Sequence, residues 1–125
     1  MSIEWFFKEK EKSAVTIHNN NITLSKSATS FFVDAYGIIV GIDNETKDLV
    51  LKKIAKEQVE NNEHRKEDLY MLTIKPSYGR INSKQLVNNI IKHYKLNFNE
   101  KTSYKFNAKW NNGLNMLVIK MNGGE

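Results

Sequence analysis

The sequence predicts a β-rich α+β fold made of two tandem copies of a β-hairpin–helix–β-hairpin unit. Short β-branched runs recur along the chain, separated by turn-forming residues. A segment near the start also aligns with a segment in the second half, and each copy has one stretch of helical apolar spacing. The chain has 125 residues, of which 40% are hydrophobic and 26% charged, so it can form one small domain or two very small units.

The repeat aligns residues 15–36 with residues 72–94, with one residue inserted in the turn of the second copy. The matched pairs are Thr16-Ile17 with Thr73-Ile74, Ser25-Lys26 with Ser83-Lys84, Tyr36 with Tyr94, and Leu49–Lys52 with Leu117–Lys120. The shared order of features indicates duplication more strongly than the few identities do. We therefore divide the chain into a first repeat with its N-terminal strand (1–54), a polar linker (55–68) and a second, basic repeat (69–125).

In the first copy, residues 15–17 and 22–24 are β-branched runs around a polar turn and predict a hairpin. Ser25 stands where a helix N-cap belongs. The following helix has its apolar residues on one face, and Gly37 is expected to end it in the left-handed conformation. Residues 38–42 and 48–54 predict a second hairpin across the loop 43–47. The apolar residues of this helix are Ala28, Phe31, Phe32 and Ala35.

The second copy repeats this order. Runs 71–74 and 80–82 flank a turn that contains Pro76 and Gly79, and Ser83 caps a helix with Leu86, Val87, Ile90, Ile91 and Tyr94 on one face. Apolar and polar residues alternate over residues 103–110, which predicts a strand with one buried face and one solvent face. The buried face carries Tyr104, Phe106, Ala108 and Trp110, the solvent face Lys105 and Lys109, and residues 115–121 return after a turn. Residues 55–68 are almost wholly polar and are predicted to be a linker or a short exposed helix.

Charge is distributed unevenly between the halves. Residues 1–62 contain eight Lys against nine acids, whereas residues 63–125 contain eleven Lys and Arg against five acids. A folded unit this basic attracts polyanions, so nucleic acid is the first partner to consider. A Lys-rich surface with no partner is the alternative interpretation of the same charge.

Several classes of function are disfavoured. The chain has no cysteine, which excludes disulfides and thiolate chemistry. His18, His64 and His93 are scattered, the acids of 43–48 fit a hairpin loop better than a calcium site, and Ser25 and Ser83 have no partner base. We therefore expect no enzyme, no metal site and no cofactor. Neither a bilayer-spanning run nor a signal peptide is expected, which favours a cytoplasmic protein that does not interact with membranes.

Gly79-Arg80-Ile81 followed by Leu86, and the run from Ile22 through Gly41 to Leu51, resemble the AbrB/MraZ-like swapped-hairpin (MazE-like) family in two tandem copies. The resemblance covers roughly residues 14–54 and 71–121. It implies a double-split β-barrel of swapped-hairpin type and a DNA-binding, transcription-regulating homodimer or higher oligomer.

By position, the resemblance implies DNA contacts from Arg80, Lys84, Lys75 and Lys26. We add Lys105 and Lys109, which share the solvent face of one predicted strand. Arg80 can pair with guanine, and Asn82, Asn88 or Asn89 with adenine.

The second hypothesis is a protein-interaction or antitoxin-like adaptor of the same fold that does not bind DNA. Its candidate docking segments are the acidic stretch 57–68 and the aromatic run Trp5-Phe6-Phe7. A small unit of this kind buries little on its own, so association with another copy is expected in either case.

Overall fold

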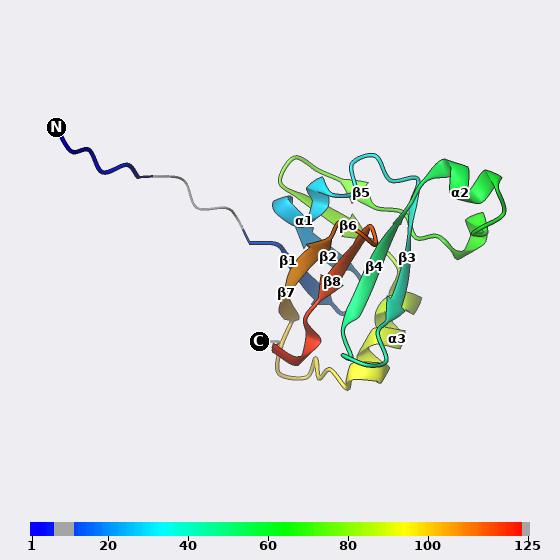
Figure 1. Cartoon of the computed structure of the whole chain (residues 1–125). Helices are drawn as coiled ribbons and strands as arrows, with labels where there is room; N and C mark the ends of the chain where they lie inside the picture. Colours follow the sequence, from blue (N-terminus) through cyan, green and yellow to red (C-terminus); the bar gives the residue numbers. More distant parts are fainter. Residues whose placement is uncertain (7–11, 124–125) are drawn as a thin grey trace.

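The computed structural model describes residues 1–6 and 12–123. Over these residues the chain forms eight strands, three helices and two 3-10 turns (Figure 1). In chain order they are β1 (Ala14–His18), β2 (Ile22–Ser25), α1 (Lys26–Ser30), β3 (Gly37–Ile42), β4 (Leu49–Ile54), α2 (Lys56–Glu60), the turn Lys66–Asp68, β5 (Thr73–Ile74), β6 (Tyr78–Ile81), α3 (Lys84–Tyr94), β7 (Ser103–Asn111), β8 (Met116–Ile119) and the turn Met121–Gly123.

The strands form one antiparallel sheet that curls into a half-barrel, in the order β3-β4-β8-β7-β1-β2-β6-β5. β7 is the longest strand and joins the two parts of the sheet. Its residues 103–107 pair with β1, and its residues 108–111 pair with β8. At the far ends, Tyr70, just before β5, bridges Ile38 of β3. The β-rich α+β fold class predicted from the sequence is therefore confirmed.

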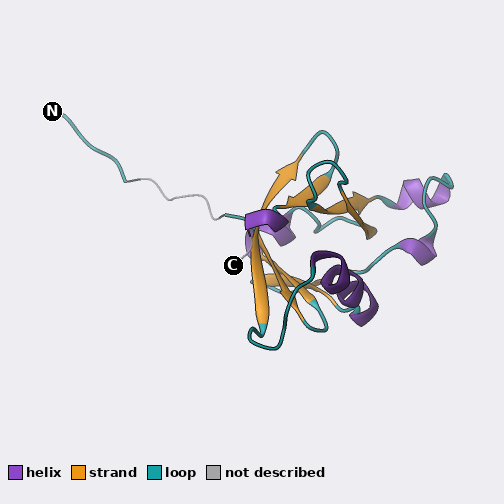
Figure 2. Ribbon diagram, turned by 90° about the horizontal axis from the view of Figure 1, so that it is seen from below, coloured by secondary structure: helices purple, strands orange, loops and turns teal. Residues whose placement is uncertain are grey.

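A single core lies inside the curl and is shared by both halves of the chain. Because side chains alternate along a strand, every second residue faces inward. Ile22 and Ile81 are a cross-strand pair in which both side chains are buried, as are Leu51 and Leu117. Burying one such side chain contributes roughly 1.5–3 kcal/mol. From α3, at the open side of the curled sheet (Figure 2), Leu86, Val87 and Ile90 complete the core.

Aromatic side chains of β7 pack inward, as the alternation predicts. Phe106 is buried, and Trp110 is stacked on Phe31 with ring centroids 4.7 Å apart. Phe32 meets the same indole edge to face at 5.5 Å. Such geometry adds about 0.5–1.5 kcal/mol per pair beyond simple burial. The first half of the chain is thus anchored to a strand of the second half.

Both predicted N-caps are confirmed. The Ser25 hydroxyl accepts a hydrogen bond from the backbone N–H of Ala28 (3.3 Å), and the Ser83 hydroxyl accepts one from Leu86 (3.2 Å). Each bond satisfies a backbone donor that the first helical turn leaves free. α3 has the predicted length, whereas α1 ends at Ser30, and its expected continuation through Phe31 and Phe32 is a series of turns.

The prediction that Gly37 ends a helix in the left-handed conformation is wrong. Gly37 is the first residue of β3 and has no positive φ. Its requirement for glycine is steric, because a Cβ there would lie 2.7 Å from Leu69 Cδ1. The glycine lets the segment after α2 cross β3 closely.

The alignment of the two copies also needs a correction in its turn. Both hairpins turn over two residues, since the His18 N–H donates to the Asn21 carbonyl and the Lys75 N–H donates to the Tyr78 carbonyl. The predicted turn 75–79 is thus too long, and β6 already begins at Tyr78. In the later of the two aligned segments the extra residue lies between strand and helix, at Asn82, whereas in the earlier one β2 runs directly into the cap Ser25.

The stretch 55–68 contains the exposed helix α2 and the turn Lys66–Asp68, which confirms a short exposed helix. A bidentate pair between Arg65 and Asp68, at 3.1 and 3.0 Å, closes this segment. Among the described residues, no helix is long and apolar enough to cross a membrane.

Candidate nucleic-acid interface

The outer face of five adjacent strands carries a continuous row of polar side chains. Strand pairing sets Thr16 opposite both Lys105 and Thr23, and sets Arg80 opposite both Thr23 and Thr73. Directly opposed residues in antiparallel strands project from the same face. We call this set the threonine row, and in order across the sheet it comprises Lys105, Thr16, Thr23, Arg80 and Thr73.

Arg80, on β6, is one of the two cations of the row. It is half-buried, and its guanidinium carbon lies 5.1 Å from the centre of the Tyr78 ring. A cation over an aromatic face is held electrostatically, by about 0.5–1 kcal/mol at an exposed site. Within the part of the chain that the structure describes, Arg80 Nε is buried and has no hydrogen-bond partner. Arg80 therefore presents a positioned, planar positive group.

Next to Tyr78 lies a pocket of about 220 Å³ between α1 and the β5–β6 turn. Lys26, the first residue of α1, and Lys75, which follows β5, both line it together with Tyr78. The apolar wall comes from Val33, Ile74 and Pro76. The fold thus brings three predicted residues together, because Lys26 and Lys75 share a pocket whose tyrosine also contacts Arg80.

Acidic residues are absent from this face. The strands β1, β2, β5, β6 and β7, all fully described, contain no Asp or Glu. Three aspartates outside these strands are engaged locally. A hydrogen bond from Lys53 lowers the pKa of Asp34, backbone N–H groups of Glu45 and Thr46 lower the pKa of Asp43, and a hydrogen bond from Arg65 lowers the pKa of Asp68. The five strands that carry the threonine row therefore add no negative charge to it.

Two of the six predicted residues lie elsewhere. Lys84 is the exposed first residue of α3 and lines neither this pocket nor the row. Lys109 alternates with Lys105 as predicted, but β7 has by then passed into the other part of the sheet, where Lys109 pairs with Val118. Lys109 lines a different pocket, of about 370 Å³, with Lys12 and Lys120. Lys120 is already paired with the buried Asp48, at 3.1 Å.

Tyr78 and the three threonines are site residues that the sequence did not single out. Tyr78 was assigned to a turn, so its position on the same face as Arg80 was missed. Two-residue spacing between Tyr78 and Arg80 was the available signal, since residues at i and i+2 share a face in any strand that includes both. The threonines give no such signal, because strand pairing alone places them level with Arg80.

Other candidates from the sequence have ordinary positions. His93 is exposed, whereas His18 and His64 are half-buried, and no group of three potential metal ligands forms among the described residues. Residues 43–48 form the β3–β4 turn, closed by a bond from the Asp43 N–H to the Asp48 carbonyl. Trp5 and Phe6 are exposed, and Phe7 lies outside the described residues.

Comparison of the chain with protein-family models, with curated proteins and with solved structures finds no match.

Proposed function

We propose that this chain is a small nucleic-acid-binding protein, of the kind that regulates transcription, and that it contacts the phosphate backbone with its threonine row. The observation that carries the proposal is the row itself: it is five strands wide, contains Arg80, ends in Lys105 and is free of acidic residues. Lys and Arg on such a face displace counterions from nucleic acid, and hydroxyl groups donate to phosphate oxygens.

The spacing of the row suits an extended polyanion. Three inter-strand steps separate Lys105 from Arg80, which at about 4.8 Å each gives about 14 Å. That length corresponds to roughly four base steps along one strand at about 3.4 Å. Lys26 and Lys75 extend the positive charge beyond Arg80, on the α1 side. Arg80 is the one group here that is both positioned and planar, and it is our candidate for a guanine or phosphate contact.

We also infer that the two halves of the chain are copies of one unit, as in the AbrB/MraZ-like swapped-hairpin family. Each half has two strands, a helix and two strands in that order. The strand pairing supports a twofold relation between the halves. The second strand of each half pairs with its counterpart, β2 with β6, and so does the fourth, β4 with β8. On this inference residues 1–54 and 69–125 are the copies, with 55–68 as the linker.

The test is a fluorescence-anisotropy titration of labelled duplex DNA at about 50 and about 200 mM salt. The affinity of the wild-type chain should fall steeply with salt. Arg80→Ala should lose about 1–3 kcal/mol of binding free energy and lower the salt slope by about one. Lys105→Ala should lower the slope similarly, whereas Lys109→Ala, in the other part of the sheet, should have a smaller effect.

Lys66→Ala is the matched control, since it removes the same charge from the exposed turn beside Glu67 and Asp68. It should bind like the wild type. Circular dichroism should be the same for all variants. Binding that is absent at low salt, or indifferent to salt, would show that the proposal is wrong, as would equal losses in Arg80→Ala and Lys66→Ala.

The second candidate is the protein-interaction adaptor. Its supporting observation is the acidic α2 segment, which stands apart from the half-barrel (Figure 1) and exposes Glu57, Glu60, Glu63 and Glu67. Two results together would favour this candidate over the first. Duplex DNA should fail to bind the chain, and a basic partner protein should bind the wild-type chain more tightly than the Glu57→Lys variant.

A further inference from the structure

β3 is an edge strand whose outward backbone groups are only partly used. The Ile38 N–H donates to the Tyr70 carbonyl at 2.9 Å, and the Tyr70 N–H donates back at 2.7 Å. Backbone groups in a strand point to alternate sides, so Val40 and Ile42 present theirs in the same direction as Ile38, away from β4. Among the described residues, neither has a hydrogen-bond partner on that side. The edge is therefore open after Ile38.

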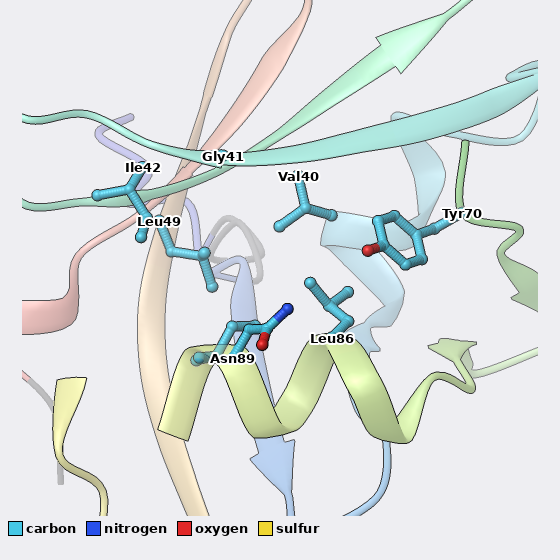
Figure 3. Close-up of a pocket in the computed structure, with 8 residues that line it drawn as sticks. Val40, Gly41, Ile42, Leu49, Tyr70, Leu86 and Asn89 are labelled. Carbon is cyan, nitrogen blue, oxygen red and sulfur yellow. The ribbon is translucent and has the colours of Figure 1, made fainter. Parts of the chain in front are cut away.

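An apolar pocket of about 210 Å³ lies alongside this open edge (Figure 3). Val40, Ile42 and Leu49 form its sheet side, and Tyr70 lies at one end. Leu86 and Asn89 extend from α3 toward the strand, and Ile90 completes the lining. No lining residue carries a charge. A segment that extended the sheet beside β3 would place every second side chain in this groove between strand and helix.

The chain contains a segment with the matching pattern. Met1, Ile3 and Trp5 alternate with Ser2 and Glu4, which over residues 1–5 is the period of a strand with one apolar face; Phe6 falls on the other face. In the structure this segment stands away from the half-barrel (Figure 1), with Ile3 55% and Trp5 68% exposed. Consecutive large apolar side chains left in solvent mark an interaction site.

We call residues 1–6 the arm. The arm of a second copy is the occupant that the topology favours. The arm enters the fold at β1, which is four positions from β3 in the strand order, across β7, β8 and β4. In Figure 1 residues 1–6 lie on the other side of the molecule from β3. Two copies can exchange arms around a twofold axis, because each has one arm and one open edge.

We propose that residues 1–6 of one copy bind as an added strand along Val40 and Ile42 of a second copy, with Ile3 and Trp5 in the groove, and so form an arm-exchanged homodimer. Main-chain bonds to β3 give affinity, and the two apolar side chains give register. This inference is independent of nucleic-acid binding, because the groove and the threonine row involve different residues.

The test compares full-length chains by sedimentation equilibrium over a range of micromolar concentrations. The wild type should dimerise. The double variant Ile3→Ser/Trp5→Ser should be monomeric, whereas the matched control Ser2→Ala/Glu4→Gln, on the opposite face of the arm, should dimerise like the wild type. These arm variants leave the folded core unaltered, so loss of dimer is not loss of fold.

A second measurement locates the contact. A synthetic peptide of residues 1–6 is titrated into the Ile3→Ser/Trp5→Ser chain, and amide hydrogen exchange is followed by NMR. The peptide should slow exchange at Val40 and Ile42 at least about tenfold and leave Thr73, on the opposite edge, unchanged. Asn89→Arg, which fills the groove from α3, should abolish this protection. The proposal is overturned if the double variant still dimerises, if the wild type is monomeric, or if the peptide protects neither amide.

Discussion

Gly79 shows how one residue without a side chain decides where a helix lies. It sits in β6, and a Cβ there would lie 2.8 Å from Thr29 Oγ1 of α1. The Thr29 hydroxyl has no room to move, because it is buried and donates to the Ser25 carbonyl at 2.8 Å. α1 therefore packs closely on β6 only while Gly79 is glycine. The glycine of the Gly-Arg segment is explained by this contact.

Gly79→Ala should destabilise the protein by about 1–3 kcal/mol, the usual cost of overpacking. Gly41→Ala is the control, since a Cβ there meets its nearest neighbour, Val50 Cγ2, at an ordinary 3.7 Å. It should change stability by less than about 0.5 kcal/mol. The measurement is the free energy of unfolding in urea. Equal effects of the two substitutions would mean that the contact with Thr29 is not what restricts position 79.

At the scale of elements, the two helix caps look alike in sequence but differ in their surroundings. The Ser83 hydroxyl caps α3 through one backbone N–H. The Ser25 hydroxyl accepts from Ala28 in α1 and also from the Ala14 N–H at 3.0 Å. Ser25 thus ties β1 to α1, in addition to ending β2.

Ser83→Ala should cost about 1 kcal/mol, as expected for the loss of one N-cap. Ser25→Ala should cost about 1–3 kcal/mol, because it leaves two partly buried donors unsatisfied. Serine-to-threonine exchange at each site retains the hydroxyl and serves as the control. Chemical unfolding of the four variants measures the difference. A larger effect at Ser83 than at Ser25 would contradict this account.

Features that depend on neighbouring residues in the chain could be predicted from the sequence. Strand alternation and caps are local signals, so the buried face of β7 and both cap serines were predicted correctly. Gly37 was misplaced because the clash that requires glycine comes from Leu69, which is distant in sequence.

The candidate site was predictable only in part for a related reason. Arg80 and Lys105 are visible as basic residues on strands, but only the pairing of β6 with β2, β2 with β1 and β1 with β7 places them level on one face. Lys109 separates from Lys105 because β7 changes partners between residues 107 and 108. A local sequence pattern contains no information about which strands pair or where a strand changes its partner.

At the scale of the whole molecule, the shared core changes the argument for association. Dimerisation was expected because each half is too small to bury a core alone. In the structure the halves bury each other, since Ile22 lies opposite Ile81 and Leu51 opposite Leu117 at the two seams between them. Folding in one chain therefore needs no second copy. The homodimer remains a prediction, and its physical reason is now the exposed arm and the open edge of β3.

A shared core also predicts that the two halves unfold together. Ile22→Val in the first half and Ile81→Val in the second should each cost about 0.5–1.5 kcal/mol and shift the same transition. Far-UV circular dichroism follows the whole sheet. In the Ile3→Ser/Trp5→Ser chain, where Trp110 is the remaining tryptophan, fluorescence follows its contact with Phe31 and Phe32. The two probes should coincide in this chain and in both isoleucine variants made in it.

The free energy of unfolding lost in the double variant Ile22→Val/Ile81→Val should differ measurably from the sum of the two single losses. The two residues are cross-strand partners and share one packing environment. The losses of unfolding free energy in Ile22→Val and Ser83→Ala should add within about 0.5 kcal/mol when the two are combined. The cap bond lost in Ser83→Ala is to the Leu86 N–H and does not involve Ile22. Two separate transitions, or a first-half substitution that shifts only one probe, would mean that each copy folds by itself. In that case the pairing of β2 with β6 would be a docking contact between independent units rather than the seam of one core.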